Sequence, residues 1–150
     1  MRALFVLGRA IFGGFFAYSA LHDFTAEEQM SQFAAAKGVP APDAAVQASG
    51  ALLLAGGLSV LAGMKPRQGL AAIISFLVSV TLQMHRFWEI EDQAQRNNEM
   101  NSFTKNFALV GAALMMMQID EPWPASVDEA RREEVMYVRL GGRDLRELPA

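Results

Sequence analysis

The sequence predicts an all-α membrane protein: a bundle of four transmembrane helices, with a short interfacial helix after the first and a polar C-terminal tail. Two observations lead to this prediction. Of the 150 residues, 52% are hydrophobic and only 19% are charged, whereas a soluble domain carries about 25% charged residues. The apolar residues are also concentrated in four stretches, each near the roughly 20 residues that cross a bilayer. These stretches are residues 3–21, 44–63, 69–84 and 103–119.

The first stretch contains an arginine, Arg9. A charged group inside a membrane span is costly and is rarely tolerated without a partner. Arg9 lies in register with Gly13 and Ala17, two small residues whose spacing lets helices approach closely. Two interpretations stay open: Arg9 faces a neighbouring helix, or it reaches back to the membrane surface, which is only about two turns away. Because Arg9 interrupts the apolar run and no clean cleavage site follows, we expect a retained helix instead of a signal peptide.

The loop after the first stretch carries the signals of a short helix. Thr25 and Glu28 form the pattern of a capping box, in which each side chain bonds to the backbone amide of the other residue. Gly38 and Pro40 then predict the end of the helix. Two placements fit the pattern equally well: a helix lying on the membrane surface, or a loop helix packed against the bundle.

The other three stretches carry features that bear on packing. In residues 44–63, small side chains recur at every fourth position, which favours close helix packing in a bilayer; they are Ala51, Ala55, Ser59 and Gly63. The stretch 69–84 can continue as a helix to Trp88, because aromatic rings favour the membrane interface. One of its faces carries a polar stripe of Ser75, Ser79 and Gln83. Asn101 or Ser102 is expected to cap the last stretch.

Charged residues predict the orientation of the bundle. The chain start, the tight loop between the second and third stretches and the region after the fourth are basic, and the other two loops are acidic. By the positive-inside rule, both termini lie in the cytoplasm of a bacterial inner-membrane protein. Residues 1–119 then form the transmembrane domain and residues 120–150 a cytoplasmic tail. In that tail, Trp123 suits an interface anchor, residues 126–129 predict a capped short helix, and the end is expected to be mobile.

Composition excludes several kinds of chemistry. The chain has no cysteine, which removes thiol catalysis, cysteine-ligated iron–sulfur clusters and covalent haem attachment. No basic block indicates a nucleic-acid partner, and no metal-ligand cluster, phosphate loop or nucleophile elbow is present. His22 and His85 are the only histidines. Two histidines can ligate one haem, but both lie at helix ends, so we do not expect haem here.

Polar residues from three helices are predicted to meet at the outer membrane surface. They are His22 and Asp23 at the end of the first stretch, His85, Trp88 and Glu89 near the end of the third, and Lys105 and Asn106 at the start of the fourth. His85 can donate, accept or ligate near neutral pH, Lys105 can neutralise an anion or pair with Glu89, and Trp88 can stack on a planar ring. These groups suit the head group of a quinone, whose carbonyl oxygens need hydrogen-bond donors. The alternative for Trp88 is an ordinary aromatic belt residue.

Several segments resemble the DoxX family of small bacterial membrane proteins. They are GRAIFGG (8–14), AKGVPAP (36–42), MHRFW (84–88) and FTKNFAL (103–109), with Ser49-Gly50 and Gly56-Gly57 between them. The resemblance runs from about residue 8 to residue 114 and omits the tail. It implies a four-helix inner-membrane protein linked to thiosulfate oxidation with a quinone acceptor, or to redox-stress complexes with partner enzymes. The residues that match its motifs are Arg9, His85, Trp88, Lys105 and Asn106.

The leading hypothesis is therefore a membrane component of a redox system that binds a quinone near the outer leaflet. In this hypothesis His85 and Lys105 donate to the ring oxygens, Trp88 stacks on the ring, and Glu89 or Asp23 relays protons. No second redox centre is evident, so a partner redox protein must supply electrons. The rival hypothesis is a non-catalytic scaffold whose small-residue faces recruit partner helices or a second copy. Permeation of a small anion past Arg9 and Lys105 ranks last. The sequence leaves open whether the chain is itself catalytic.

Overall fold

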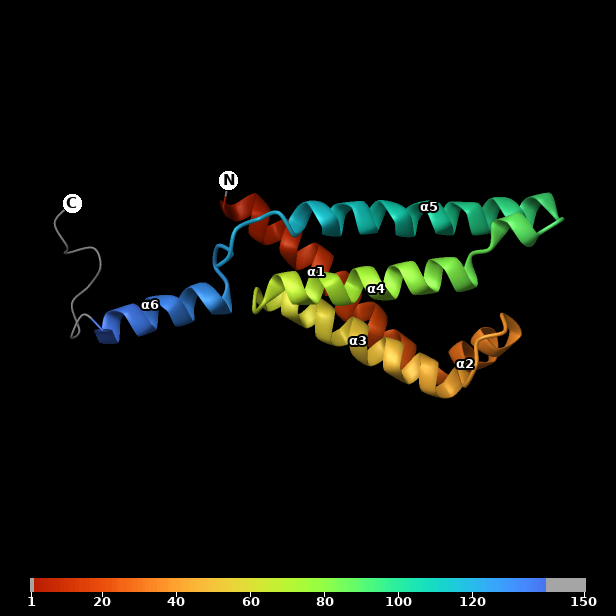
Figure 1. Ribbon diagram of the computed structural model, residues 1–150, viewed down its shortest axis with the longest axis horizontal. Helices are drawn as coiled ribbons and strands as arrows, with labels where there is room; N and C mark the ends of the chain where they lie inside the picture. The colour runs from red at the N-terminus through yellow and green to blue at the C-terminus, as the bar shows by residue number, and fades with distance from the viewer. Residues whose placement is uncertain (1, 140–150) are drawn as a thin grey trace.

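The computed structural model describes residues 2–139, and this part of the chain is helical with no strand. Helices α4 and α5 run side by side along the long axis, α1 crosses α3, and α6 projects from one end (Figure 1). The elements in order are α1 (Arg2–Thr25), α2 (Glu27–Ala36), α3 (Pro42–Ala62), α4 (Pro66–Met84), the 3-10 turn η1 (Phe87–Glu89), α5 (Gln93–Met116) and α6 (Val127–Arg139).

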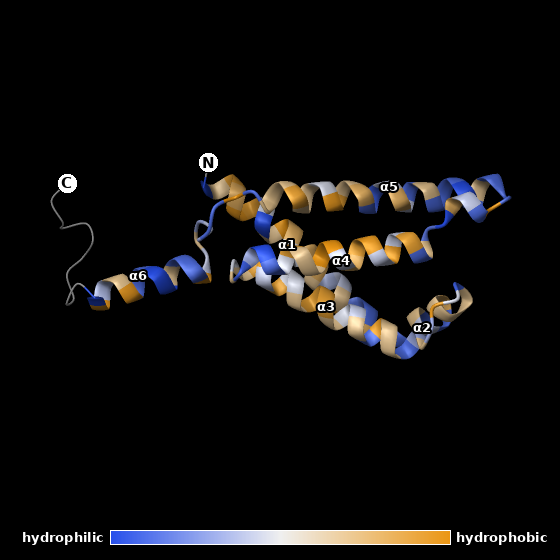
Figure 2. Ribbon diagram, viewed as in Figure 1, coloured by the Kyte–Doolittle hydropathy of each residue, from blue (hydrophilic) through white to orange (hydrophobic). Residues whose placement is uncertain are grey.

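Three helices in the described part of the chain are long and apolar enough to cross a membrane: α1, α3, and α4 counted with the residues up to Glu89. Helix α5 is not among them, although its 24 residues would suffice in length. It begins ten residues before the predicted span, with a run of Gln, Arg, Asn and Glu that is hydrophilic in Figure 2. The fourth span therefore stays a prediction.

Helices α1 and α3 cross at glycines. The spacing of small residues on the first helix predicted such a close approach. A Cβ added to Gly13 would lie 2.7 Å from the backbone nitrogen of Leu61. A Cβ added to Gly57 would lie 2.6 Å from the backbone nitrogen of Ala17. Both distances are far below van der Waals contact, so only glycine allows these backbones to approach this closely. The predicted stripe on the second helix is only partly buried. Ala51 and Ala55 are exposed, whereas Ser59 lies close to Gly69 and Gly63 lies close to Ser126.

The predicted capping box at Thr25 is wrong. Helix α1 continues to Thr25, whose hydroxyl donates to the backbone oxygen of His22 at 2.8 Å. Helix α2 starts only at Glu27, and its N-cap, Ala26, makes no side-chain bond. The helix itself is confirmed. It packs against α3 with Ser31 and Ala34 buried, and its placement at the membrane surface stays a prediction.

Two predicted helix boundaries around residue 90 are also wrong. Helix α4 does not continue to Trp88 but ends at Met84, and the short turn η1 follows. Neither Asn101 nor Ser102 caps α5. Its N-cap is Asp92, whose carboxylate accepts a hydrogen bond from the backbone amide of Gln95 at 2.8 Å. An aspartate at this position satisfies an otherwise unpaired amide of the first turn, which explains the earlier start.

The segment after α5 folds back onto the bundle. Trp123 has an exposed fraction of 0% and packs edge-to-face on Phe5, with ring centroids 5.3 Å apart. It is therefore a core residue and not the predicted interface anchor. The predicted short helix in the tail is confirmed as α6, with the Ser126 hydroxyl accepting from the backbone amide of Glu129 at 3.0 Å. The end of the tail, predicted to be mobile, lies outside the described residues.

Candidate functional site

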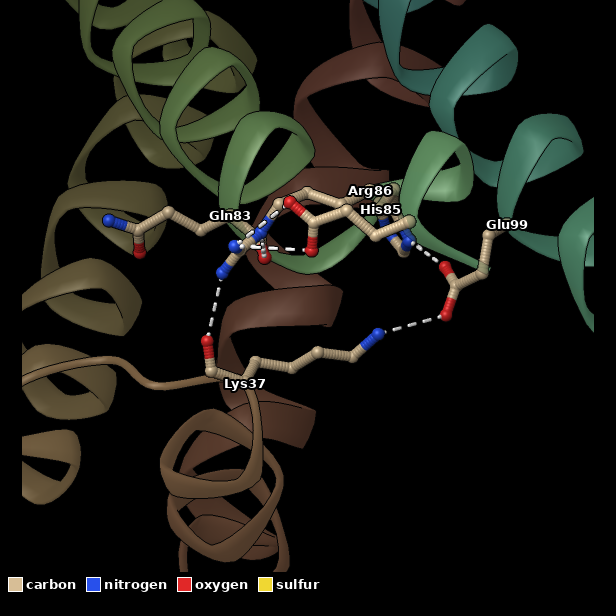
Figure 3. Close-up of polar contacts among 6 residues, drawn as sticks. Lys37, Gln83, His85, Arg86 and Glu99 are labelled. Atoms are coloured by element: carbon tan, nitrogen blue, oxygen red, sulfur yellow. Dashed lines mark hydrogen bonds and ion pairs between the residues drawn. The ribbon is translucent and has the colours of Figure 1, made fainter. Parts of the chain in front are cut away.

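An ionic cluster joins three helices at the end of α4. The carboxylate of Glu99, on α5, lies 2.6 Å from Nδ1 of His85 and 3.2 Å from Nζ of Lys37, which caps α2 (Figure 3). Each side chain is largely shielded, with exposed fractions of 20%, 24% and 15% for His85, Lys37 and Glu99. Ion pairs that are shielded from water are screened less than surface pairs, so this cluster can hold the ends of α2, α4 and α5 together.

Arg86 extends the cluster toward α2. Its Nη2 donates to the backbone oxygen of Lys37 at 3.0 Å, and its Nε donates to the backbone oxygen of Gln83 at 3.1 Å. Its Nη1 lies 3.4 Å from the carboxylate of Glu89. Glu89 is thus paired with Arg86 instead of with Lys105, and Arg86 holds the turn after α2 in place.

The environment of Glu99 favours its charged form. Burial alone raises the pKa of this carboxyl, because it disfavours a charge in a poorly solvated site. Hydrogen bonds from His85 and Lys37, together with the attraction of their positive charges, outweigh burial and leave the pKa of Glu99 below its usual value. The carboxylate is therefore ionised near neutral pH and can bind Lys37 and His85 at the same time.

The remaining predicted residues on this side are spread over two faces of α5 and the η1 turn. Trp88 is 51% exposed and packs its edge against Phe87 and Phe103, with centroids 5.2 Å and 6.1 Å away. Asn106 is half-buried and lies seven positions after Glu99, hence on the same face of α5. Lys105 is exposed and lies six positions after Glu99, on a different face, with no ion-pair partner among the described residues.

Arg9, on α1, lies far from this cluster, near the segment that follows the C-terminal end of α5. Its Nη1 donates to the backbone oxygen of Pro124 at 3.1 Å and its Nη2 to that of Ala125 at 2.8 Å. The side chain is only 6% exposed. The guanidinium is therefore held by the segment between α5 and α6, and not by a neighbouring transmembrane helix.

A largely apolar pocket of about 330 Å³ lies between α3 and α4, with the end of α2 at its rim. Leu52 and Phe76 contribute apolar surface, and the predicted polar stripe of Ser75, Ser79 and Gln83 lines one wall. The side chain of Gln83 points away from His85 and Glu99 in Figure 3. The pocket and the ionic cluster thus occupy opposite sides of the end of α4.

Sequence reasoning found His85 but missed its partners. Glu99 falls in one of the loops predicted to be acidic, because the predicted helix starts ten residues too late to include it, and no sequence pattern pairs Lys37 with it. The signal that could have found Glu99 is Asp92, an N-cap residue three positions before Gln95. Within the described residues no group of three histidines or acidic side chains could hold a metal ion, and His22 is exposed and stacks on Tyr18.

The fold and the apolar helices define a helical membrane protein. The DoxX family model matches residues 4–86, which is more than half of the chain. The protein therefore belongs to the DoxX family, as its motifs indicated. The match covers α1 to the end of α4 and stops at Arg86, so the resemblance seen in residues 103–109 lies beyond it. No curated protein and no solved structure matches the chain.

Proposed function

We propose that this DoxX protein is a membrane component of a redox system and binds the head group of a quinone in the pocket between α3 and α4. The observation that carries the proposal is the pocket itself: an apolar space within the membrane-crossing helices, with polar groups gathered along one wall. Binding sites for small amphipathic ligands have this character, because apolar walls bury the ring and a few polar groups orient it.

The lining residues fit a quinone in their chemistry. Ser79 and Gln83 line the pocket and carry a hydroxyl and an amide, which can donate to the two ring oxygens, while Phe76 and Leu52 supply apolar surface for the ring. A bound quinone supplies the capacity to accept two electrons and two protons. This assignment replaces the two donors favoured by the sequence, His85 and Lys105, and the stacking residue Trp88 with residues that line one pocket.

The ionic cluster would then position the rim of the pocket. Ala34 and Val39 line the pocket on its α2 side, and Lys37 lies between them in the chain. The ion pair of Lys37 with Glu99 fixes this segment. His85, hydrogen-bonded to Glu99 on the other side of α4, holds that carboxylate in place and does not line the pocket. A partner redox protein is required to supply electrons.

The proposed placement is a bacterial inner membrane, with α5 as a fourth span and both termini in the cytoplasm. Basic residues at the Arg9 end of the bundle, including Arg2, Lys65 and Arg67, support this orientation. A protease-cleavable tag on the C-terminus should resist digestion in intact cells and be cut after lysis. Cleavage of the tag in intact cells would show that the C-terminus lies outside the cytoplasm, which contradicts the proposed orientation.

Titration of the purified protein with a short-chain quinone tests the site. Replacing Gln83 with Leu removes one donor and should weaken binding by about fivefold, the effect of one hydrogen bond. Ser79→Ala should have a similar effect. Gln68→Leu is the matched control, because it makes the same change on α4 outside this pocket. Equal affinities for the wild type, Gln83→Leu and Ser79→Ala would refute the site.

The scaffold alternative keeps one specific observation in its favour. Ala51 and Ala55 form a small-residue surface on α3 that is exposed in the structure. Such surfaces allow a helix from a partner or a second copy to pack closely in a bilayer. Chemical cross-linking in native membranes should lose a specific adduct in Ala55→Leu and retain it in Ala71→Leu, an exposed alanine on α4. Unchanged adducts in Ala55→Leu would remove this alternative.

A further inference from the structure

A second pocket, of about 420 Å³, lies at the other end of the seam between α3 and α4. This end is where α3 stops at Ala62 and α4 starts at Pro66, so the pocket lies at the level where the spans leave the membrane. Two basic side chains from different elements line it: Lys65 from the turn and Arg131 from α6. Gln68 adds an amide to the same wall.

The fold itself brings the two cations together. The backbone amide of Lys65 donates to the carboxylate of Asp128 at 2.7 Å, which attaches the first turn of α6 to the turn between α3 and α4. Arg131 follows Asp128 by three residues, one turn along α6. Within the described residues neither Lys65 nor Arg131 forms an ion pair. Neither side chain is therefore held in a salt bridge in this part of the chain, and the Asp128 carboxylate is bound by the backbone amide of Lys65.

The wall of the pocket that extends into the membrane has few bulky side chains. It is formed by Ala55, Gly56, Gly69 and Ala72. The helices are so close here that a Cβ on Gly69 would lie 2.5 Å from the Ser59 hydroxyl oxygen, and one on Gly56 would lie 2.9 Å from the Gly69 carbonyl oxygen. The result is a shallow apolar trough that starts beneath two cations, a shape that accommodates an acyl chain below a charged head group.

We propose that this pocket binds an anionic phospholipid, with its phosphate between Lys65 and Arg131 and one acyl chain along the trough. Basic pockets between transmembrane helices at the membrane surface are suited to such head groups. The site lies at the opposite end of the α3–α4 seam from the quinone pocket. Its occupancy does not depend on quinone binding, so the two proposals can fail separately.

The test is binding of phosphatidylglycerol to the full-length protein in detergent, measured by native mass spectrometry against phosphatidylcholine. The wild type should retain phosphatidylglycerol preferentially. Lys65→Gln and Arg131→Gln should each lower its affinity by about fivefold, and the double variant by about twenty-fivefold. The matched control is Arg132→Gln, which removes the neighbouring charge on α6 from a side chain that does not line this pocket. A thermal unfolding curve confirms that each variant is folded.

Three results would overturn the proposal. One is equal retention of phosphatidylglycerol by the wild type and the double variant. Another is a loss of affinity in Arg132→Gln as large as the loss in Lys65→Gln or Arg131→Gln. The third is displacement of phosphatidylglycerol by millimolar inorganic phosphate, because that would show a site for a free anion without a contribution from the acyl chain. Resistance to inorganic phosphate, together with selective loss in the Lys65 and Arg131 variants, supports a lipid site.

Discussion

At the scale of single residues, Glu99 and Arg9 show how a charge is stabilised at each end of this protein. Glu99 is held by two basic side chains, whereas Arg9 is held by two backbone carbonyls. Hydrogen bonds that involve a charged group are stronger than neutral ones. Both residues connect segments far apart in the sequence, so each contributes to tertiary structure more than to its own helix.

The stability of the protein should depend on the ionisation of Glu99. Because the folded structure lowers the pKa of Glu99, its contribution is fully present above the unfolded value of 4.5 and is lost as the pH falls through the lower, folded value. Thermal unfolding in detergent between pH 7 and pH 3 should show a loss of stability in acid that Glu99→Gln reduces. An identical acid dependence in Glu99→Gln would show that other groups control it.

Removing the charge of Arg9 should release the C-terminal segment. Arg9→Leu deletes hydrogen bonds to the oxygens of Pro124 and Ala125, and should destabilise the protein by about 2–4 kcal/mol. Limited proteolysis should then cut near residue 124 faster than in the wild type. Arg96→Leu, at an exposed position on α5, is the control and should leave the cleavage rate unchanged. Equal cleavage of both variants would contradict a clamping role.

At the scale of elements, the end of α2 is the part of the fold that connects the ionic cluster to the proposed quinone pocket. Ala34 and Val39 line the pocket, and the residues between them are held by Glu99 and by Arg86. Gly38, with a φ of 77°, makes the tight turn that this arrangement needs. The rim of the pocket therefore depends on contacts made on the other side of α4.

Loss of the Lys37 charge should loosen this rim without changing the pocket walls. In Lys37→Met, hydrogen exchange of the backbone amides of residues 34–39 should be faster than in the wild type, because the ion pair to Glu99 is lost. Quinone affinity should fall as well. Lys105→Met is the matched control, since Lys105 is exposed on another face of α5. If Lys105→Met weakened quinone binding and Lys37→Met did not, the donor expected from the sequence would be the correct one.

The elements also show what the sequence could predict. Long apolar runs identified α1, α3 and α4, because twenty apolar residues have few other stable arrangements. Helix α5 was placed too late, since its first half is polar and its start depends on one aspartate cap. The partners of His85 were missed for the same reason. Without a helix that includes Glu99, nothing in the sequence placed this carboxylate beside residues 37 and 85.

At the scale of the whole molecule, the helices form a row in which α1 packs on α3, α3 on α4 and α4 on α5. The seam between α3 and α4 lies within this row and carries a pocket toward each end. One is apolar with neutral polar groups, and the other carries two basic side chains. This division suits a ring inside the membrane at one end and a charged head group at the surface at the other.

The most direct measurement for the central claim is organic extraction of the protein purified from its native membrane, with quinones quantified by mass spectrometry against a mock preparation. We expect near-stoichiometric quinone in the wild type and in Gln68→Leu, and a clear loss in Gln83→Leu, because Gln83 lines the pocket. Quinone at the level of the mock preparation in the wild type, or equal amounts in the wild type and Gln83→Leu, would contradict it.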